Sequence, residues 1–274
     1  TSADSEQDDD DPSMRQFRIV NGQSSIIDWL RSGLDPTRTD LRLGTAVTDV
    51  AWSAGAVTLT CKPAVASSKP YTINARAVVI TIPIGVWKAP REQQGAIRFD
   101  PALPDKERAI EKLETGHVVK IAFRFRERFW AEDTQGPLFL HSNDRFIPTW
   151  WTTSPVRSPI LVAWAGGHAA DALLAEKDVM IDRVLDAMSQ AWNIPRRRLD
   201  ALLAGTFTHD WQSDPWSRGA YSYAGVGGSH AHAALAKPVK KTLFFAGEAT
   251  SGDQTGTVAG AIDSGLRAAK EVLR

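Results

Sequence analysis

The sequence contains only one cysteine, Cys61, among its 274 residues. A single thiol excludes an internal disulfide and any metal site that is built from several cysteines. The six histidines are scattered and none begins an HExxH motif. His230 and His232 are only two positions apart, so they do not form an i, i+4 ligand pair on a helix. The sequence therefore predicts no zinc or iron site.

Long apolar runs are also missing. No stretch approaches the roughly 20 residues that a membrane-spanning helix needs, and no signal-peptide pattern opens the chain. We therefore expect a cytoplasmic protein without a membrane segment. Hydrophobic residues make up 43% of the chain and charged residues 23%. That composition is typical of a globular protein with one large core or two smaller ones.

The formal net charge is zero, but the two signs are unevenly distributed. Residues 1–12 hold six acidic side chains and no Lys or Arg, which leaves 32 basic and 26 acidic side chains in the remainder. We interpret residues 1–14 as a disordered acidic tail. Such a tail could bind a basic partner, although a solvated linker is the simpler interpretation. Nothing in the sequence indicates a nucleic-acid partner.

The last quarter of the chain is the most informative part. Residues 242–250 predict a buried strand that ends in a Gly–Glu corner. A loop of small residues follows, and from Thr257 onward the spacing becomes helical. One face of this helix carries Val258, Ala261, Ile262, Gly265, Leu266, Ala269 and Val272.

This strand, corner and helix together favour a nucleotide-cofactor site. Small residues let a ligand approach the helix start, where unpaired N–H groups present positive partial charge. Glu248 could accept hydrogen bonds from sugar-like hydroxyls. The alternative interpretation is an ordinary strand–helix connection with tight glycine packing.

The rest of the chain mixes strands and helices in irregular order. Strands are predicted at 17–22, 41–50, 56–61, 77–82, 118–125 and 159–164, and helices at 24–30, 101–114 and 178–192. Without regular βαβ alternation, this order predicts an α+β (mixed α/β) fold. We expect a cofactor framework from residues 15–90 and 205–274, with an antiparallel sheet and helices inserted at 91–204. A cleft between the two parts would hold the ligand.

Several segments, in this order along the chain, resemble one known family. They are VNGQ at 20–23, LRLGTAV at 41–47, AVVITIPIGVWK at 77–88, IRFDPALP at 97–104, GHVVKIAF at 116–123, FW at 129–130, WQSDPWSRGAYSY at 211–223 and FFAGEAT at 244–250. The set resembles the flavin-containing amine oxidases, and most closely their polyamine oxidase and lysine-specific histone demethylase branch. The resemblance implies a glutathione-reductase-like FAD-binding domain with an inserted substrate-binding domain.

The resemblance also implies which residues bind FAD. They are Val47 at the adenine through its backbone, Thr81 and Pro83 on a turn beside the cofactor, Trp211 and Trp216 near the isoalloxazine ring, Gly247 with Glu248 at the ribityl chain, and Thr257 with Val258 at the helix start. Monoamine oxidases attach FAD to a cysteine at the position that Ala220 occupies here. The resemblance therefore implies a non-covalent flavin.

Lys120 is the sharpest candidate for a catalytic role. It stands between Val119 and Ile121 in an apolar strand, so the period of two turns it away from both. From the residues alone it would point to solvent, whereas the resemblance implies that it holds a water near flavin N5. Tyr221 would form an aromatic wall for the substrate amine. Thr257 would stand opposite, where monoamine oxidases carry a tyrosine.

The implied reaction is hydride transfer from the carbon next to a neutral amine to flavin N5. The imine then hydrolyses, and O₂ reoxidises the flavin with release of H₂O₂. Polyamines are the first expected substrates. The family's Gly-rich βαβ unit has no counterpart in this sequence. We therefore expect a truncated gene product, a processed chain or one subunit of a split enzyme, with an upstream chain that carries the Gly-rich unit as the partner. Two alternatives remain: a related flavoenzyme of the desaturase or protoporphyrinogen oxidase type, and an inactive chain that binds a partner through an exposed sheet edge.

Overall fold

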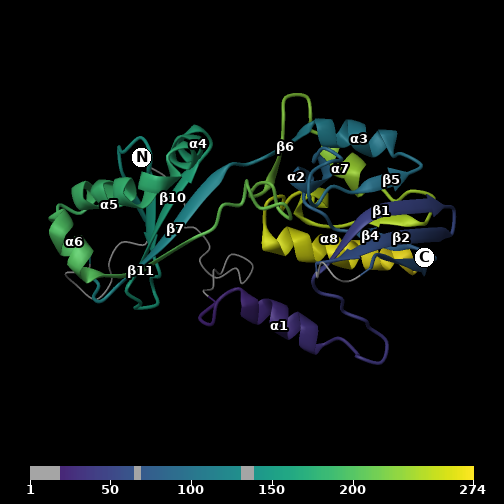
Figure 1. Cartoon of the computed structure of the whole chain (residues 1–274), viewed down its shortest axis with the longest axis horizontal. Helices are drawn as coiled ribbons and strands as arrows, with labels where there is room; N and C mark the ends of the chain where they lie inside the picture. The colour runs from purple at the N-terminus through teal and green to yellow at the C-terminus, as the bar shows by residue number, and fades with distance from the viewer. Residues whose placement is uncertain (1–18, 65–68, 131–138) are drawn as a thin grey trace, which may run out of the picture.

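The computed structural model describes residues 19–64, 69–130 and 139–274. The acidic tail predicted at residues 1–14 lies outside these ranges. Figure 1 shows two lobes, one around α8 near the C-terminus and one around α4, α5 and α6. The several sheets and interspersed helices confirm the mixed α/β class that the sequence predicts.

The first lobe contains a four-stranded sheet with the order β3-β2-β1-β5. Its strands are β1 (Thr45–Ser53), β2 (Ala56–Pro63), β3 (Tyr71–Ala75) and β5 (Arg98–Asp100). β1 and β2 form the predicted antiparallel pair, and Gly55 in the connecting turn has a φ of 79° that favours glycine. β5 joins β1 in parallel only from Asp49 to Ala51. On the edge of β1 that faces β5, the residues near Val47 therefore do not pair with β5.

A second sheet of this lobe consists of two parallel strands, β4 (Val78–Ile80) and β13 (Leu243–Phe245). All three residues of β13 are buried, as its apolar run predicts. α2 (Ile84–Trp87) follows β4, and the 3-10 turn η3 (Glu248–Thr250) follows β13. The Ala246 N–H donates to the Ile80 carbonyl at 2.9 Å. The carboxyl ends of the two strands therefore lie side by side.

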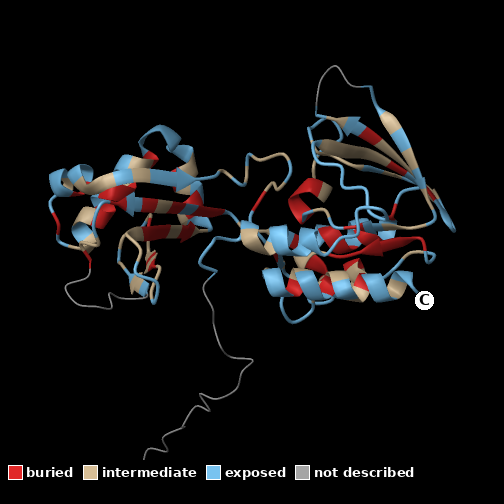
Figure 2. Ribbon diagram, turned by 90° about the horizontal axis from the view of Figure 1, so that it is seen from below, coloured by how far each residue is buried: buried red, intermediate tan, exposed pale blue. Residues whose placement is uncertain are grey.

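α8 (Val258–Val272) confirms the predicted C-terminal helix but buries an unexpected face. Its buried residues are small: Gly260, Ser264 and Ala268, at a spacing of four. The larger apolar residues stay exposed, with exposed fractions of 57% for Val258, 41% for Ile262 and 58% for Leu266. Figure 2 shows this alternation of buried and exposed residues along the helix. Small residues let α8 approach the strands closely, and its predicted apolar face points outward.

The first lobe is completed by α3 (Pro104–Glu111), β6 (Leu113–Thr115), β12 (Ser222–Ala224) and α7 (Ala231–Ala236). β6 pairs with β12, and α3 packs against α7. The predicted helix at 101–114 is therefore shorter, because its last residues form β6. The sequence groups β5 and α3 with the inserted part that begins at residue 91. Their pairing and packing place them in the first lobe instead.

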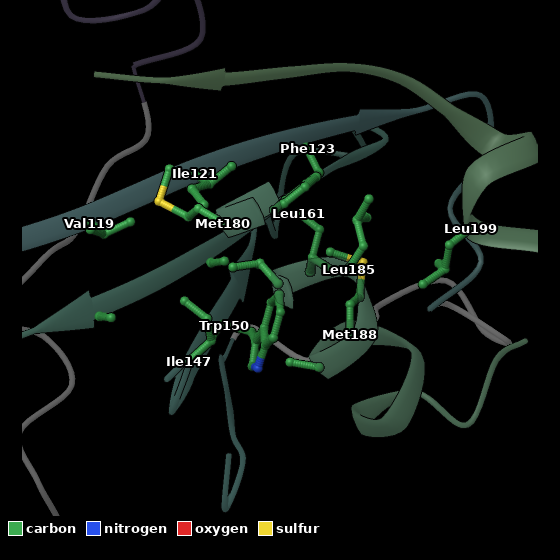
Figure 3. Packing of buried hydrophobic residues seen from close by; sticks show 14 of the residues in the cluster. Val119, Ile121, Phe123, Ile147, Trp150, Leu161, Met180, Leu185, Met188 and Leu199 are labelled. Carbon is green, nitrogen blue, oxygen red and sulfur yellow. The ribbon is translucent and has the colours of Figure 1, made fainter. Parts of the chain in front are cut away.

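The second lobe contains the predicted antiparallel sheet, with the order β11-β7-β10-β9-β8. Its strands are β7 (Val118–Phe125), β8 (Phe139–His141), β9 (Thr149–Thr152), β10 (Ile160–Gly166) and β11 (Leu203–Thr208). Its helices are α4 (His168–Ala175), α5 (Met180–Ala191), which the turn η2 (Lys177–Val179) precedes, and α6 (Arg196–Leu202). Figure 3 shows Val119, Ile121 and Phe123 of β7 packed with Leu161, Trp150 and Met188. The amphipathic α5 closes this core, as predicted.

The described chain begins with a turn and then α1 (Ser24–Ser32), which has no buried residue and lies apart from both lobes in Figure 1. The sequence predicts that residues 17–22 are a strand that runs into a turn, and the described residues 19–22 form the turn and no strand. The Gly22 N–H donates to the Ile19 carbonyl, and Gly22 has a φ of 81°, which closes a turn. No helix in the described ranges has both the length and the apolarity to cross a membrane.

Candidate functional site

A corner forms where the carboxyl ends of β4 and β13 meet the helices. Gly247 has a φ of 113°, and a Cβ added there would lie 3.8 Å from the Thr81 carbonyl oxygen. The Gly247 N–H donates to Ser264 Oγ of α8 at 2.8 Å, and Pro83 occupies the N-cap position of α2. In α/β sheets, ligands bind outside the carboxyl ends of parallel strands. The corner therefore has the geometry of a ligand site.

Glu248 connects three segments of this corner. One carboxylate oxygen accepts the Ser222 N–H at 3.0 Å. The other accepts the Ser222 hydroxyl at 2.8 Å and the Gly256 N–H at 2.9 Å. An ionised carboxylate offers about four lone-pair positions. After three internal hydrogen bonds, Glu248 retains capacity for about one ligand hydroxyl.

The N-terminus of α8 lies beside the same carboxylate. Thr257 caps the helix: its hydroxyl accepts the Gly260 N–H at 2.9 Å and donates to the Gln254 carbonyl at 2.7 Å. Val258, the first helical residue, is exposed. The first turn of a helix leaves backbone N–H groups free for an anionic or polar ligand group. Because these two hydrogen bonds engage the Thr257 hydroxyl, the methyl group is the part of this side chain that could contact a substrate.

Tyr221 and Gly256 meet at the edge of this corner. A Cβ at Gly256 would lie 3.6 Å from the tyrosine ring, and one at Gly116 would lie 3.3 Å from it. A cavity of about 460 Å³ lies beside them and is also lined by Tyr223 and His232. His232 Nδ1 is 2.8 Å from the Ala249 carbonyl oxygen. Since a carbonyl only accepts, Nδ1 carries a proton in this arrangement.

The segment between β11 and β12 presents two indole rings. The backbone that carries one of them is held by Asp214, because a carboxylate oxygen accepts the backbone N–H of Trp216 at 2.8 Å. The backbone N–H of Trp216, together with the nearby His209 ring, lowers the pKa of Asp214 below its usual value. The Trp211 ring lies 4.4 Å from the His209 ring, and both indoles are exposed. Trp216 lines a second cavity of about 1090 Å³, which residues on both sides of Val47 also line.

Lys120 lies on β7 of the second lobe and is exposed. Its neighbours Val119 and Ile121 are buried, so the alternation predicted from the sequence is confirmed. Its ammonium nitrogen is 5.7 Å from the centroid of the Trp151 ring, and Trp164 is its partner on β10. Sequence reasoning missed both indoles. The consecutive tryptophans of β9 are a sequence signal for Trp151 alone, and Trp164 lies in the strand predicted at 159–164.

The predicted site residues therefore fall into three groups, apart from Trp211, which lies against the His209 ring. The corner holds Thr81, Pro83, Tyr221, Gly247, Glu248, Thr257 and Val258. The second cavity has Trp216 and the neighbours of Val47 in its walls, while the Val47 side chain packs against the core. Lys120 lies on the second sheet. Among the residues that the structure describes, no group of three or more His, Cys, Asp or Glu side chains could hold a metal ion.

Comparison with known proteins gives one consistent result. A family model described as flavin containing amine oxidoreductase matches residues 3–273. The chain is 34% identical over 261 residues to polyamine oxidase 4 of Oryza sativa subsp. japonica, covering 92% of this chain and 48% of that protein. It is 30% identical over 280 residues to lysine-specific histone demethylase 1 homolog 3 of Arabidopsis thaliana, covering 93% of this chain and 16% of that protein.

A solved structure of putrescine oxidase bound to putrescine has the same fold, with a TM-score of 0.74 and 22% identity. It covers 94% of this chain, and this chain covers 54% of it. The chain thus spans about half the length of its oxidase relatives, or less for the demethylase. The fold expected from the motifs is confirmed. The chain belongs to the flavin-containing amine oxidoreductase family.

Proposed function

We propose that this chain binds FAD and supports the oxidation of an amine, with a polyamine as substrate. FAD would supply the hydride acceptor, flavin N5, and O₂ would accept the electrons afterwards. The observation that carries the proposal is the corner at the carboxyl ends of β4 and β13. There, Glu248 keeps one acceptor position for a ribityl hydroxyl, and the start of α8 offers backbone N–H groups near Val258.

The aromatic residues suit the flat ring and the cationic substrate. Trp211 and Trp216 present exposed indoles and precede Tyr221 in the sequence. The Tyr221 ring lies beside Gly256 at the corner. An amine arrives as a cation, which the face of an aromatic ring attracts before the amine loses its proton. Thr257 would form the opposite, non-aromatic wall.

Lys120 is the proposed proton-handling residue. Its ammonium projects from a sheet face with two indoles as neighbours and would hold a water through its three N–H groups. Relatives that act on polyamines support this substrate class: the polyamine oxidase of Oryza sativa and the putrescine oxidase. A lysine on the substrate lobe and an aromatic wall on the other lobe would hold the amine between them.

The proposal includes a further unit that adds to the β4–β13 sheet and to α8. The apolar stripe of Val258, Ile262 and Leu266 is exposed, and the parallel pair β4–β13 is a two-stranded sheet in the described structure. Parallel sheets are normally larger and covered by helices on both faces. We propose that a βαβ unit with a Gly-rich turn adds to this sheet and packs on α8. The greater length of the relatives supports it, whether the unit lies in the same polypeptide or in another chain.

Reduction of bound flavin by a polyamine tests this function. The flavoprotein is mixed with spermidine without oxygen, and the loss of the visible flavin band is followed. Lys120→Met should slow the loss by about 100-fold, as expected for a group that handles a proton, without lowering flavin content. Lys270→Met on the exposed side of α8 is the matched control. Equal rates for Lys120→Met and the parent protein would contradict the role of Lys120.

A further inference from the structure

The chain crosses between the two lobes in two places, and these crossings are hydrogen-bonded to each other (Figure 1). Residues 116–117 lead from β6 to β7, and residues 220–221 end the return from β11 to β12. The Gly116 N–H donates to the Tyr221 carbonyl at 2.8 Å, and the Ala220 N–H donates to the Gly116 carbonyl at 3.0 Å. These four residues form a connector in which the two crossings hold each other in place.

His117 attaches this connector to α4 of the second lobe. Its ring Nδ1 is 2.5 Å from a carboxylate oxygen of Asp171, which lies in the first turn of α4. Since an ionised carboxylate only accepts hydrogen bonds, Nδ1 is the donor in this pair. The His117 carbonyl accepts the N–H of Gly167, the N-cap residue of α4, at 3.0 Å. The side chain and the backbone of one residue therefore both hold the connector to the start of the same helix.

Two residues of the proposed site lie next to the connector. The Tyr221 ring lies against Gly116, where an added Cβ would be only 3.3 Å from the ring. Lys120 follows His117 by three residues on β7, and its side chain is exposed. Tyr221 belongs to the corner of the first lobe, whereas Lys120 belongs to the second lobe. The connector is therefore the covalent and hydrogen-bonded link between the aromatic ring and the lysine.

The contact between His117 and Asp171 suits a positioning role better than a stabilising one. The two side chains are 50% and 48% exposed, and ion pairs with such exposure contribute little to stability. We propose that His117 is a positioning residue: through Asp171 it holds the connector, and with it the Tyr221 ring, in the orientation that binds the amine. The part of Tyr221 in binding the amine rests on the function proposed above, whereas its link to His117 does not.

Fluorine NMR of the chain labelled with fluorotyrosine tests this link without flavin or substrate. The chain has three tyrosines, Tyr71, Tyr221 and Tyr223, and Tyr221→Phe identifies the Tyr221 resonance by its loss. His117→Phe keeps a ring but removes the donor, so the Tyr221 resonance should shift while that of Tyr71 on β3 stays. Asp171→Ala should also shift the Tyr221 resonance. The double variant should add no further shift, because both changes remove the same contact.

Two control variants separate positioning from a general disturbance. His117→Asn is the conservative variant, because its amide N–H is bonded to Cγ, as Nδ1 is in histidine. It should keep the Tyr221 resonance near its position in the parent protein. His168→Gln is the matched control, because the exposed His168 ring lies 3.9 Å from the other oxygen of Asp171 but outside the connector. It should leave the resonance unchanged, and thermal unfolding establishes that each variant is folded.

Reduction of bound flavin by spermidine without oxygen gives the functional measurement. The spermidine concentration that gives half the maximal rate should rise about three- to tenfold in His117→Phe and Asp171→Ala, because a displaced ring attracts the cation less. The rate at saturating spermidine should fall less than about twofold, since Lys120 is unchanged. Flavin content should stay at the parent level. His117→Asn should restore the parent concentration dependence.

Two results would overturn the proposal: a Tyr221 resonance that does not move in His117→Phe and Asp171→Ala, or one that moves no more than that of Tyr71. The proposed function fails separately. If the resonance responds as expected but spermidine does not reduce the flavin, the positioning of the ring stands and amine oxidation does not. If spermidine reduces the flavin and both variants keep the parent concentration dependence, amine oxidation stands and the positioning role is refuted.

Discussion

Lys106 of α3 gives the sharpest test of the first lobe's packing. It is only 3% exposed, and its ammonium donates to the carbonyls of Ala234, Leu235 and Lys237 at the end of α7. It also lies 4.2 Å from the centroid of the Phe245 ring on β13. One side chain thus joins α3, α7 and the buried strand. Burial lowers the pKa of Lys106 from its ordinary value of 10.5 to about 8.

This lowered pKa makes the free energy of unfolding depend on pH. Below about pH 8 the folded and unfolded chains both hold the proton, so Lys106 adds no pH dependence. Between about pH 8 and 10.5 only the unfolded chain keeps it, so the free energy of unfolding rises with pH. From about pH 7 to about pH 9.5 the expected gain is about 2 kcal/mol, because each pKa unit corresponds to about 1.4 kcal/mol.

Lys106→Met isolates this contribution, because methionine fills the space without a charge. The difference in unfolding free energy between the parent protein and the variant should grow by about 2 kcal/mol over that pH range. Urea unfolding followed by tryptophan fluorescence measures it, and hydrogen exchange of the α7 amides localises it. Lys270→Met, on an exposed position of α8, should leave the pH dependence unchanged. A parent–variant difference that stays constant with pH would refute the reasoning.

Three further predictions concern the corner and its surroundings. Glu248→Ala removes the acceptor of three hydrogen bonds, so the free energy of unfolding should fall by about 1–3 kcal/mol. Thermal unfolding measures this loss, and an unchanged midpoint would contradict the stabilising role of these hydrogen bonds. Gly85→Ala places a Cβ 2.2 Å from a backbone carbonyl oxygen and should lower the free energy of unfolding by about 1–3 kcal/mol. Gly33→Ala is the control, because a Cβ has room there and should not destabilise the protein. A double variant in which Ile262 and Leu266 are both replaced by lysine should show less self-association in sedimentation, without loss of stability. If the double variant is less stable than the parent protein, this face of α8 is buried.

The local elements that follow from sequence patterns are those with strong periodicity. β7 occupies residues 118–125 as predicted, because four alternate apolar side chains need one buried sheet face. α5 matches its amphipathic pattern for the same reason, since its apolar face covers that core. The β1–β2 hairpin follows from alternation around Gly55. In each case the partner that buries the apolar face lies within the same lobe.

The periodicity of apolar residues does not predict which face of a helix packs against the rest of the protein. α8 shows this, because its apolar stripe is present but Gly260, Ser264 and Ala268 form its buried contacts. Similarly, no local signal shows that β5 pairs with β1, which lies about 50 residues earlier in the chain. Two of the three donors to Glu248 belong to Ser222, which lies on the separate strand β12, and the third is the Gly256 N–H in the loop before α8. The sequence therefore predicted the carboxylate but not its three donors.

The visible absorption spectrum of the chain after incubation with FAD and gel filtration tests the central claim most directly. Flavin bands that stay with the folded protein, are released on denaturation and disappear when spermidine is added without oxygen are the predicted result. Release on denaturation is expected because Ala220 stands where, by the resemblance, monoamine oxidases carry the cysteine that binds FAD. A folded protein that retains no flavin would contradict the claim that this chain forms a flavin site.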